Sequence, residues 1–138
     1  MGAEVNATGE DGMEATALAR RAMAAVEGKR REEWLGLFAE ECQVEDPVGH
    51  LPTIHGKAAL TQFWDQAIAS TSSVEFEITR QWDAGEEAML LATVSIVGAN
   101  GVQVSYDGTF NYALDETGRI ASLRAFWDFP AVVAAFSA

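Results

Sequence analysis

One stretch of strict alternation constrains the fold more than any other feature of this chain. Between residues 102 and 114, apolar side chains point one way and polar side chains point the other. Such a period of two predicts a long strand of an antiparallel sheet with one face against a core. Gly108 interrupts the apolar series, so we expect a bend or bulge of a strongly curved sheet there. The apolar members of the series are Val102, Val104, Tyr106, Phe110, Tyr112 and Leu114.

Three further strands are predicted around this one. Residues 74–79 alternate between apolar and polar side chains, as in a strand buried on one face. Residues 89–97 are apolar on both faces, which predicts a strand that is central or covered by a partner. Residues 120–127 form the last strand. Glycine-containing turns at residues 98–101 and 115–118 separate these segments.

The first half of the chain has helical spacing instead. Apolar residues three and four apart predict helices over about residues 13–26, 31–39 and 57–70. A short strand from Cys42 to Asp46 ends before Pro47. The sequence therefore predicts an α+β fold, with three N-terminal helices packed on a curved antiparallel sheet. Their shared interior is either a solid core or a pocket.

Length and charge limit the domain organisation and the partners. A chain of 138 residues suits a single domain, and we expect a flexible tail over residues 1–12 and that domain over residues 13–138. The formal net charge is −12, which disfavours nucleic acids and anionic membranes as partners. Cys42 is the only cysteine, so no internal disulfide can form. Without a signal-peptide pattern or an apolar run of about 20 residues, a cytoplasmic location is expected.

Asp46 is the candidate catalytic residue. Strand side chains alternate, so Asp46 lies on the same face as Cys42 and Val44. If that face points inward, burial raises the pKa of the carboxyl, as a general base requires. Alternatively, Asp46 accepts hydrogen bonds from the loop that follows it.

Three short motifs resemble those of bacterial ketosteroid isomerases. They are VEDPVG at residues 44–49, IHGK at residues 54–57, and the chain end from GRI at 118–120 to RAFW at 124–127. The likeness spans about residues 14–130. It implies the cone-shaped fold of the nuclear transport factor 2-like, SnoaL-like superfamily. It also implies that Asp46 moves a proton between two carbons of a steroid, and that Trp127 touches the ligand.

The resemblance does not extend to the groups that hold the enolate oxygen in that family, a Tyr and a protonated Asp. Their places fall near Arg21 and at Phe110, and those of the supporting hydroxyls fall at Phe38 and Trp64. None of these residues is a phenol or a carboxylic acid. Losing one such donor typically costs about 100- to 1000-fold in rate, so we expect weak activity on standard ketosteroids.

Two charged residues could substitute for the missing donors. Arg21 could hold an enolate or a substrate carboxylate, or it could lie on a solvated helix face beside Arg20. Simple alternation turns Asp107 outward, where it could meet another subunit. A bulge at Gly108 would turn it inward.

Apolar residues from the helices and strands are expected to line the pocket, although any one of them could be ordinary core packing. No metal and no cofactor are expected, because the spacing of Cys42, His50 and His55 fits no standard zinc site. The expected lining residues are Phe38, Phe63, Trp64, Phe76, Met89, Tyr106, Phe110, Ala125 and Trp127.

Three functions remain open from the sequence. The chain could be a steroid-isomerase-like enzyme acting on a flat apolar ligand, or a protein that binds a steroid or polyketide without turnover. It could also be another enzyme of this fold, such as a polyketide cyclase. An epoxide hydrolase would need an Asp-Arg-Asp set in the pocket. Because family members usually pair through the outer sheet face, we also expect a homodimer.

Overall fold

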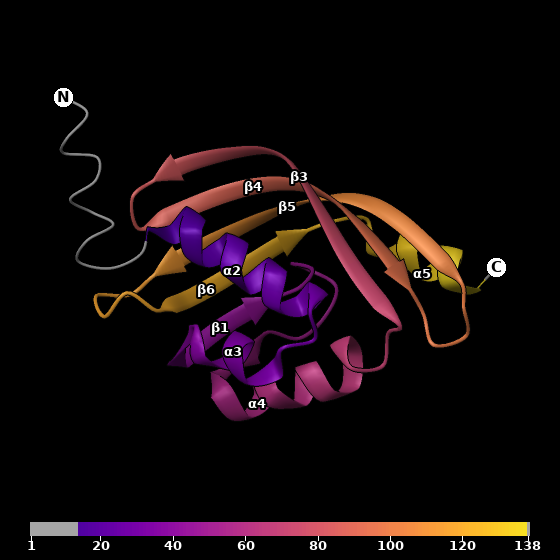
Figure 1. Ribbon diagram of the computed structural model, residues 1–138, viewed down its shortest axis with the longest axis horizontal. Coiled ribbons are helices and arrows are strands. Elements are labelled where there is room, and N and C mark those ends of the chain that lie inside the picture. The colour runs from indigo at the N-terminus through magenta and orange to yellow at the C-terminus, as the bar shows by residue number, and fades with distance from the viewer. Residues whose placement is uncertain (1–13, 138) are drawn as a thin grey trace.

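Helices occupy the concave side of one curved sheet (Figure 1). The computed structural model describes residues 14–137. The helices α2 (Ala15–Glu27) and α3 (Arg31–Gly36) come first, followed by the strands β1 (Phe38–Glu45) and β2 (Ile54–His55). The α+β architecture is confirmed, and the tail expected at the N-terminus lies outside the described residues.

The second half of the chain is mainly β. Helix α4 (Gly56–Phe63) continues into the π-helical turn η1 (Trp64–Ile68), so the predicted third helix exists but changes its winding halfway. π-helical turns are frequent at functional sites. The remaining elements are β3 (Ser73–Ala84), β4 (Glu87–Val97), β5 (Gln103–Leu114), β6 (Ile120–Phe126) and α5 (Phe129–Ser137).

Helix α2 packs through the stripe that its sequence predicts. Leu18, Ala22, Ala25 and Val26 are all buried, and the helix ends at Gly28 as expected. Small residues dominate this stripe, so the helix backbone can approach the sheet closely. The charged residues of α2 are left on the opposite face.

The second helix is shorter than predicted. It stops at Gly36, and β1 begins at Phe38, where the sequence predicted that helix to continue to residue 39. Phe38 pairs with Ile120 of β6 and is fully buried. Tertiary pairing with the last strand therefore overrides the helical spacing of this segment.

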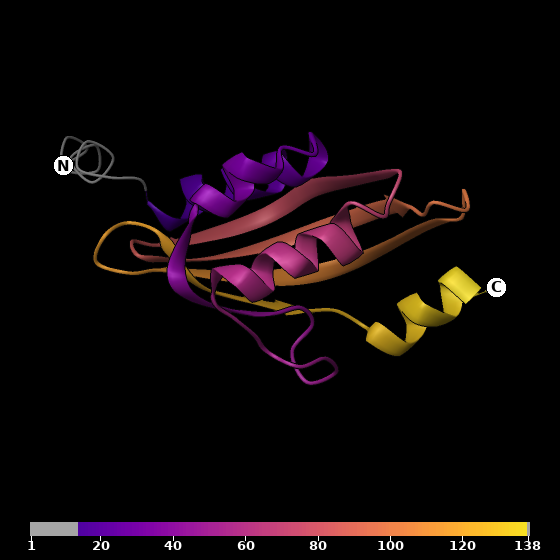
Figure 2. The same cartoon turned by 90° about the horizontal axis from the view of Figure 1, so that it is seen from below.

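Six strands form one sheet in the order β2-β1-β6-β5-β4-β3. All neighbouring pairs are antiparallel except β1 and β6, which run parallel, with Val44 opposite Leu123 and Glu45 opposite Arg124. This parallel pairing brings the end of β1 beside the end of β6. Figure 2 shows the sheet from below, with α2 and α4 lying across its inner face.

The expected irregularity at Gly108 is absent, which corrects the sequence interpretation. The β4–β5 register runs without a break through Ala92 opposite Gly108. The register shifts occur elsewhere, between Phe38 and Gln43, between Ile78 and Arg80, and between Ala113 and Leu114. Gly108 serves packing instead, because a Cβ there would lie 3.2 Å from Phe126 O and 3.3 Å from the Phe110 ring.

A C-terminal helix was missed in the sequence. Helix α5 follows β6 and lies at one end of the sheet (Figure 1). Its sequence, FPAVVAAFS, is short and mostly apolar, so it carries no clear helical period. Val132 on this helix is buried. Within residues 14–137, none of the helices is both long and apolar enough to cross a membrane.

Adjacent leucines in β4 test which sheet face is the inner one. Leu90 is fully buried on the inner face, whereas Leu91 is half-buried on the outer face. We expect Leu90→Ala to lower the free energy of unfolding by about 2–5 kcal/mol and Leu91→Ala by roughly 1 kcal/mol or less. Urea denaturation at one protein concentration measures both. Equal losses would contradict the assignment of the faces.

Candidate functional site

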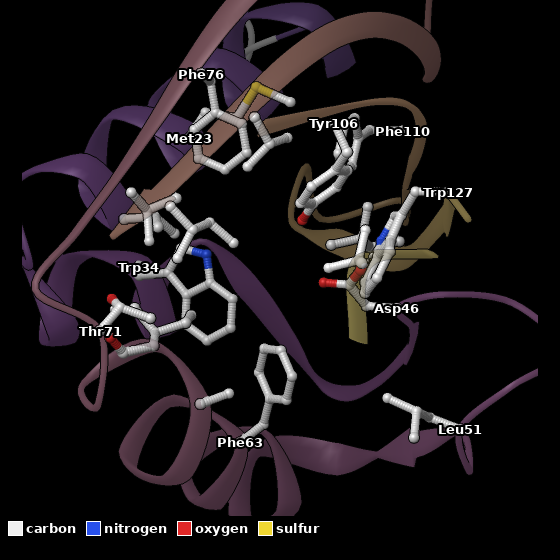
Figure 3. Close-up of a pocket in the computed structure, with 18 of the residues that line it drawn as sticks. Met23, Trp34, Asp46, Leu51, Phe63, Thr71, Phe76, Tyr106, Phe110 and Trp127 are labelled. Atoms are coloured by element: carbon white, nitrogen blue, oxygen red, sulfur yellow. Dashed lines mark hydrogen bonds between the residues drawn. The ribbon is translucent and has the colours of Figure 1, made fainter. Parts of the chain in front are cut away.

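The site is a cavity between the helices and the concave face of the sheet. Its volume is about 260 Å³, slightly below the roughly 300–1,000 Å³ of pockets that hold drug-sized molecules. Helices α2, α3, α4 and α5, the turn η1 and strands β3 to β6 all contribute to the wall, and most of the lining side chains are apolar. Figure 3 shows Asp46 among aromatic residues on one side of this space.

Strand parity sets the direction of Asp46. Cys42 and Val44 of β1 are buried, and Asp46 follows them on the same face and lines the cavity. Glu45 points the other way and pairs with Arg124, with 2.7 Å between Glu45 Oε1 and Arg124 Nε. The Asp46–Pro47 peptide bond is cis.

One hydrogen bond fixes the Asp46 carboxyl. The indole N–H of Trp127 donates to Asp46 Oδ1 at 2.7 Å. Trp127 comes directly after β6, so the parallel pairing of β1 and β6 places the two residues within reach. Figure 3 shows the indole nitrogen turned toward one carboxyl oxygen, while the other oxygen points into the cavity.

Burial raises the pKa of Asp46 above its ordinary value, because the surrounding protein removes water from the charged form. The hydrogen bond from Trp127 acts in the opposite direction, but burial is the larger effect. A carboxyl of raised pKa accepts a proton more readily than an exposed one. The geometry therefore suits a group that takes up and returns a proton.

Two phenols of β5 lie near this carboxyl. Tyr106 and Tyr112 both line the cavity, and the ring centroid of Tyr106 lies 4.9 Å from that of Trp127. Burial raises the pKa of both phenols, and the negative charge of Asp46 raises it further. Both hydroxyls therefore keep their protons at neutral pH and can donate hydrogen bonds.

The opposite side of the cavity is supported by Lys29. Its Nζ donates to the main-chain oxygens of Ile68 and Thr71, at 3.0 and 2.6 Å. Lys29 has a φ of 57°, in the left-handed region that a non-glycine residue rarely adopts. These hydrogen bonds tie the end of α2 to the end of η1, where Ile68 and Thr71 line the cavity.

Neither charged candidate from the sequence reaches the cavity. Arg21 is exposed on the outer side of α2, where its Nη2 lies 3.9 Å from Glu33 Oε2. Asp107 lies on the outer face of β5 and accepts a hydrogen bond from Thr93 Oγ1 at 2.7 Å. The inward direction considered for Asp107 requires a bulge at Gly108, which the continuous register rules out.

Some of the expected lining residues lie in the wall of the cavity, and these are Phe63, Phe76, Tyr106, Phe110 and Trp127.

The other four expected lining residues do not line it. Phe38 and Trp64 are buried behind Trp34, with ring centroids 4.9 and 5.2 Å from it. Met89 faces the outside, because its neighbour Leu90 takes the inner face. Ala125 is fully buried opposite Phe110 of β5 and does not line the cavity.

Several lining residues were missed in the sequence. Trp34 lines the cavity, and its ring lies 6.4 Å from that of Phe63, a pairing of two helices that no local pattern reveals. Tyr112 was assigned to the inner face but not to the pocket, although its alternation with Tyr106 and Phe110 was a usable signal. Val132 and Phe136 enter from the unpredicted helix α5.

The histidines and the cysteine stay apart from this site. Cys42 is buried, and the His50 ring packs on Phe129 at 5.4 Å. Among residues 14–137 there is no group of three His, Cys, Asp or Glu side chains that could hold a metal ion.

Comparison with protein families decides the classification. The profile of the SnoaL-like domain matches residues 19–123, which is most of the chain. The chain belongs to the SnoaL-like domain family. A search of curated protein sequences finds no significant match to this SnoaL-like domain.

Solved structures confirm the nuclear transport factor 2-like fold. A Delta 5-3-ketosteroid isomerase from Mycobacterium sp. is 26% identical, with a TM-score of 0.80 over 86% of this chain and 97% of that one. RV0760c from Mycobacterium tuberculosis, in complex with estradiol-17beta-hemisuccinate, is 23% identical, with a TM-score of 0.79 over 86% and 97%. The epoxide hydrolase/cyclase-like enzyme SalBIII is 19% identical, with a TM-score of 0.75 over 84% and 92%.

The Asp46 carboxyl of this SnoaL-like domain, half-buried in the cavity wall, predicts a pH-dependent stability. The folded pKa of Asp46 is raised, so stability falls as pH rises from the ordinary value of about 3.9 through the raised pKa. An asparagine side chain in its place cannot ionise. We expect Asp46→Asn to match the wild type near pH 3 and to be more stable at pH 7. Each unit by which the pKa is raised adds about 1.4 kcal/mol to this difference.

Chemical denaturation across a pH series measures this difference. Glu45→Gln is the matched control, because Glu45 lies on the opposite face and pairs with Arg124. A difference between Asp46→Asn and the wild type that does not change with pH would contradict the raised pKa of the carboxyl.

Proposed function

We propose that this SnoaL-like domain binds a flat apolar small molecule, such as a steroid or a polyketide, and that Asp46 is the general base for proton transfer next to a carbonyl group. The observation that carries the proposal is the Asp46 carboxyl in the wall of a mostly apolar cavity, with one oxygen held by the Trp127 indole N–H. Removing a carboxylate from water is costly, and groups with perturbed pKa values in clefts cluster at functional sites.

The proposed reaction moves one proton and needs no co-reactant. Asp46 takes a proton from the carbon next to a carbonyl, and the electron pair of that C–H bond forms an enolate. The protonated carboxyl then returns the proton to a different carbon of the conjugated system. Because Trp127 occupies Oδ1, the second oxygen of the carboxyl is the one available to the ligand. The double bond shifts position, and Asp46 ends as it began.

The relatives support a steroid-like ligand. A ketosteroid isomerase shares this fold at 26% identity, and RV0760c has been seen in complex with a steroid ester. The lining of the cavity, with Phe63, Phe76 and Phe110, suits rigid fused rings. Planar faces of this kind gain contact area at little cost in ligand entropy.

Binding without turnover is the second candidate. The observation that favours it is the lack of a hydrogen-bond donor at both expected oxyanion positions. Phe110 has no polar group, and Arg21 lies outside the cavity. Epoxide hydrolysis is disfavoured despite the likeness to SalBIII, because neither Arg21 nor Asp107 joins Asp46.

A homodimer through the outer sheet face stays a prediction. The outer residues of β4 that follow Met89 are half-buried, and Trp82 on β3 and Phe126 on β6 are 47% and 41% exposed. Sedimentation velocity at micromolar concentration should show a species of twice 14.8 kDa. A species of monomer mass alone would contradict this prediction.

Turnover of a 5-ene-3-ketosteroid tests the proposed reaction. We expect the conjugated enone to form, followed by its absorbance, and Asp46→Asn to lower kcat by at least about 100-fold, which is typical for loss of a general base. Binding of the steroid by the variant should persist, because the apolar wall is unchanged. Turnover that survives Asp46→Asn would overturn the role of Asp46. Tight binding by the wild type without turnover would favour the binding module.

The pH dependence gives an independent check of the same base. Only the ionised carboxyl accepts a proton, so kcat/KM should rise with pH through the pKa of Asp46 and then level off. Because burial raises this pKa, the midpoint should lie above the ordinary value of about 3.9. A profile that is flat from pH 4 to pH 8 would contradict this expectation.

A further inference from the structure

The proposed proton transfer leaves a negative charge on a ligand oxygen, and the cavity must stabilise it. An enolate oxygen in an apolar, water-poor space requires hydrogen-bond donors aimed at it. The side chains that bring an N–H or O–H group to the wall of this cavity are Trp34, Thr71, Tyr106, Tyr112 and Trp127.

Two of these donors are already engaged. The Trp127 indole N–H donates to Asp46, and the Thr71 hydroxyl donates to Ile68 O at 2.7 Å. Within residues 14–137, no partner is found for the hydroxyls of Tyr106 and Tyr112 or for the indole N–H of Trp34. Yet no described side-chain nitrogen or oxygen is both sealed from solvent and unbonded. The two hydroxyls and the indole N–H must therefore be accessible to solvent or to a ligand. Their side chains all line the cavity.

Tyr106 is the donor that lies beside the base. Its ring packs on Trp127 at 4.9 Å, and Trp127 holds Asp46 through the 2.7 Å hydrogen bond. The three residues thus form one continuous cluster whose members fix each other's positions. Figure 3 shows the hydroxyl of Tyr106 and the free carboxyl oxygen of Asp46 pointing into the same part of the cavity.

We propose that the Tyr106 hydroxyl is a catalytic hydrogen-bond donor that holds the ligand oxygen while Asp46 carries the proton. This proposal rests on the proposed function. It places the donor on the sheet, in strand β5, and not on helix α2, where Arg21 is exposed. Tyr106 keeps its own proton throughout. The electron pair of the C–H bond becomes the carbon–carbon double bond of the enolate. The π pair of the carbonyl moves onto the oxygen that Tyr106 binds, until Asp46 returns the proton.

The electrostatics of the cluster favour the transition state over the bound ligand. Before reaction, burial and, to a smaller extent, the negative charge of Asp46 both disfavour a charge on Tyr106 and raise the pKa of this phenol. When Asp46 takes the proton, the effect of its charge disappears while charge builds on the ligand oxygen. The hydrogen bond from Tyr106 therefore strengthens as the enolate forms, which is the condition for a donor to increase kcat.

The other two free donors are less well placed. Tyr112 is only 4% exposed and lies opposite Leu123, deeper along β5 than Phe110, so little of its surface is open to a ligand. Trp34 belongs to α3 and packs against Phe63 and Trp64, on the side of the cavity away from Trp127 in Figure 3. Tyr112 therefore provides the matched comparison for Tyr106.

The first experiment compares Tyr106→Phe with Tyr112→Phe in ketosteroid turnover. Each change removes one oxygen and keeps the ring. We expect Tyr106→Phe to lower kcat by about 100- to 1000-fold with little change in KM, as for loss of an oxyanion donor. The loss in Tyr112→Phe should be at least tenfold smaller. Because the Tyr106 hydroxyl has no partner within residues 14–137, the thermal midpoint of Tyr106→Phe should match that of the wild type.

A second experiment does not depend on turnover. Equilenin is a steroid with a phenol ring, and its ionised form is distinguished by absorbance and resembles an enolate. Bound to Asp46→Asn, which imitates the protonated base, equilenin should ionise at a lower pH than when bound to Asp46→Asn with Tyr106→Phe. Loss of a hydrogen bond to a charged acceptor should raise the ionisation midpoint of bound equilenin by about 1–2 pH units between these two variants.

The two experiments separate the two claims. If the wild type lacks turnover but the equilenin ionisation shifts with Tyr106→Phe, the proposed reaction fails and the donor role stands. If turnover depends on Asp46 but Tyr106→Phe keeps its kcat, the donor role is overturned and the base assignment stands. A loss in Tyr112→Phe as large as in Tyr106→Phe, or an equilenin ionisation unchanged by Tyr106→Phe, also overturns the donor role.

Discussion

The hydrogen bond from Trp127 to Asp46 is the contact on which the rest of the site depends. It joins the ends of β1 and β6, which become neighbours only because these strands pair in parallel. Without a partner, a carboxyl in this apolar wall would be costly to retain. One indole N–H lowers that cost without removing it, so the pKa of Asp46 stays raised and the group remains able to accept a proton.

The helices and the sheet supply different kinds of side chain to the cavity. The helices supply mainly apolar and aromatic surface, as Met23 and Phe63 do. The polar groups near the base come from strand ends and from β5, because a sheet with one face inward can place Tyr106, Phe110 and Tyr112 in a row at fixed spacing. A rigid frame of this kind holds reacting groups in position before the ligand arrives.

The sequence predicted what simple periodicity controls. Alternation predicted the faces of β5. The parity of β1 placed Asp46 on the face of Cys42 and Val44 but did not decide between the cavity and the following loop. Prediction from periodicity failed where a segment fits two patterns or none. Phe38 fits a helix as well as a strand, and pairing with Ile120 decides. Met89 lies in a run that is apolar on both faces, so alternation does not show which face of the sheet its side chain takes. Helix α5 is too short and uniformly apolar to show a period, and the place of Trp34 depends on packing between helices.

The central claim is that the Asp46 carboxyl, half-buried in the wall of a mostly apolar cavity, has a pKa above that of an ordinary aspartate. A carbon-13 NMR titration of the side-chain carboxyl carbons, with Asp46→Asn used to assign the signal, measures this directly on the free protein. We predict a midpoint for Asp46 clearly above about 3.9, the ordinary value for an aspartate. A midpoint at or below that value would contradict the account.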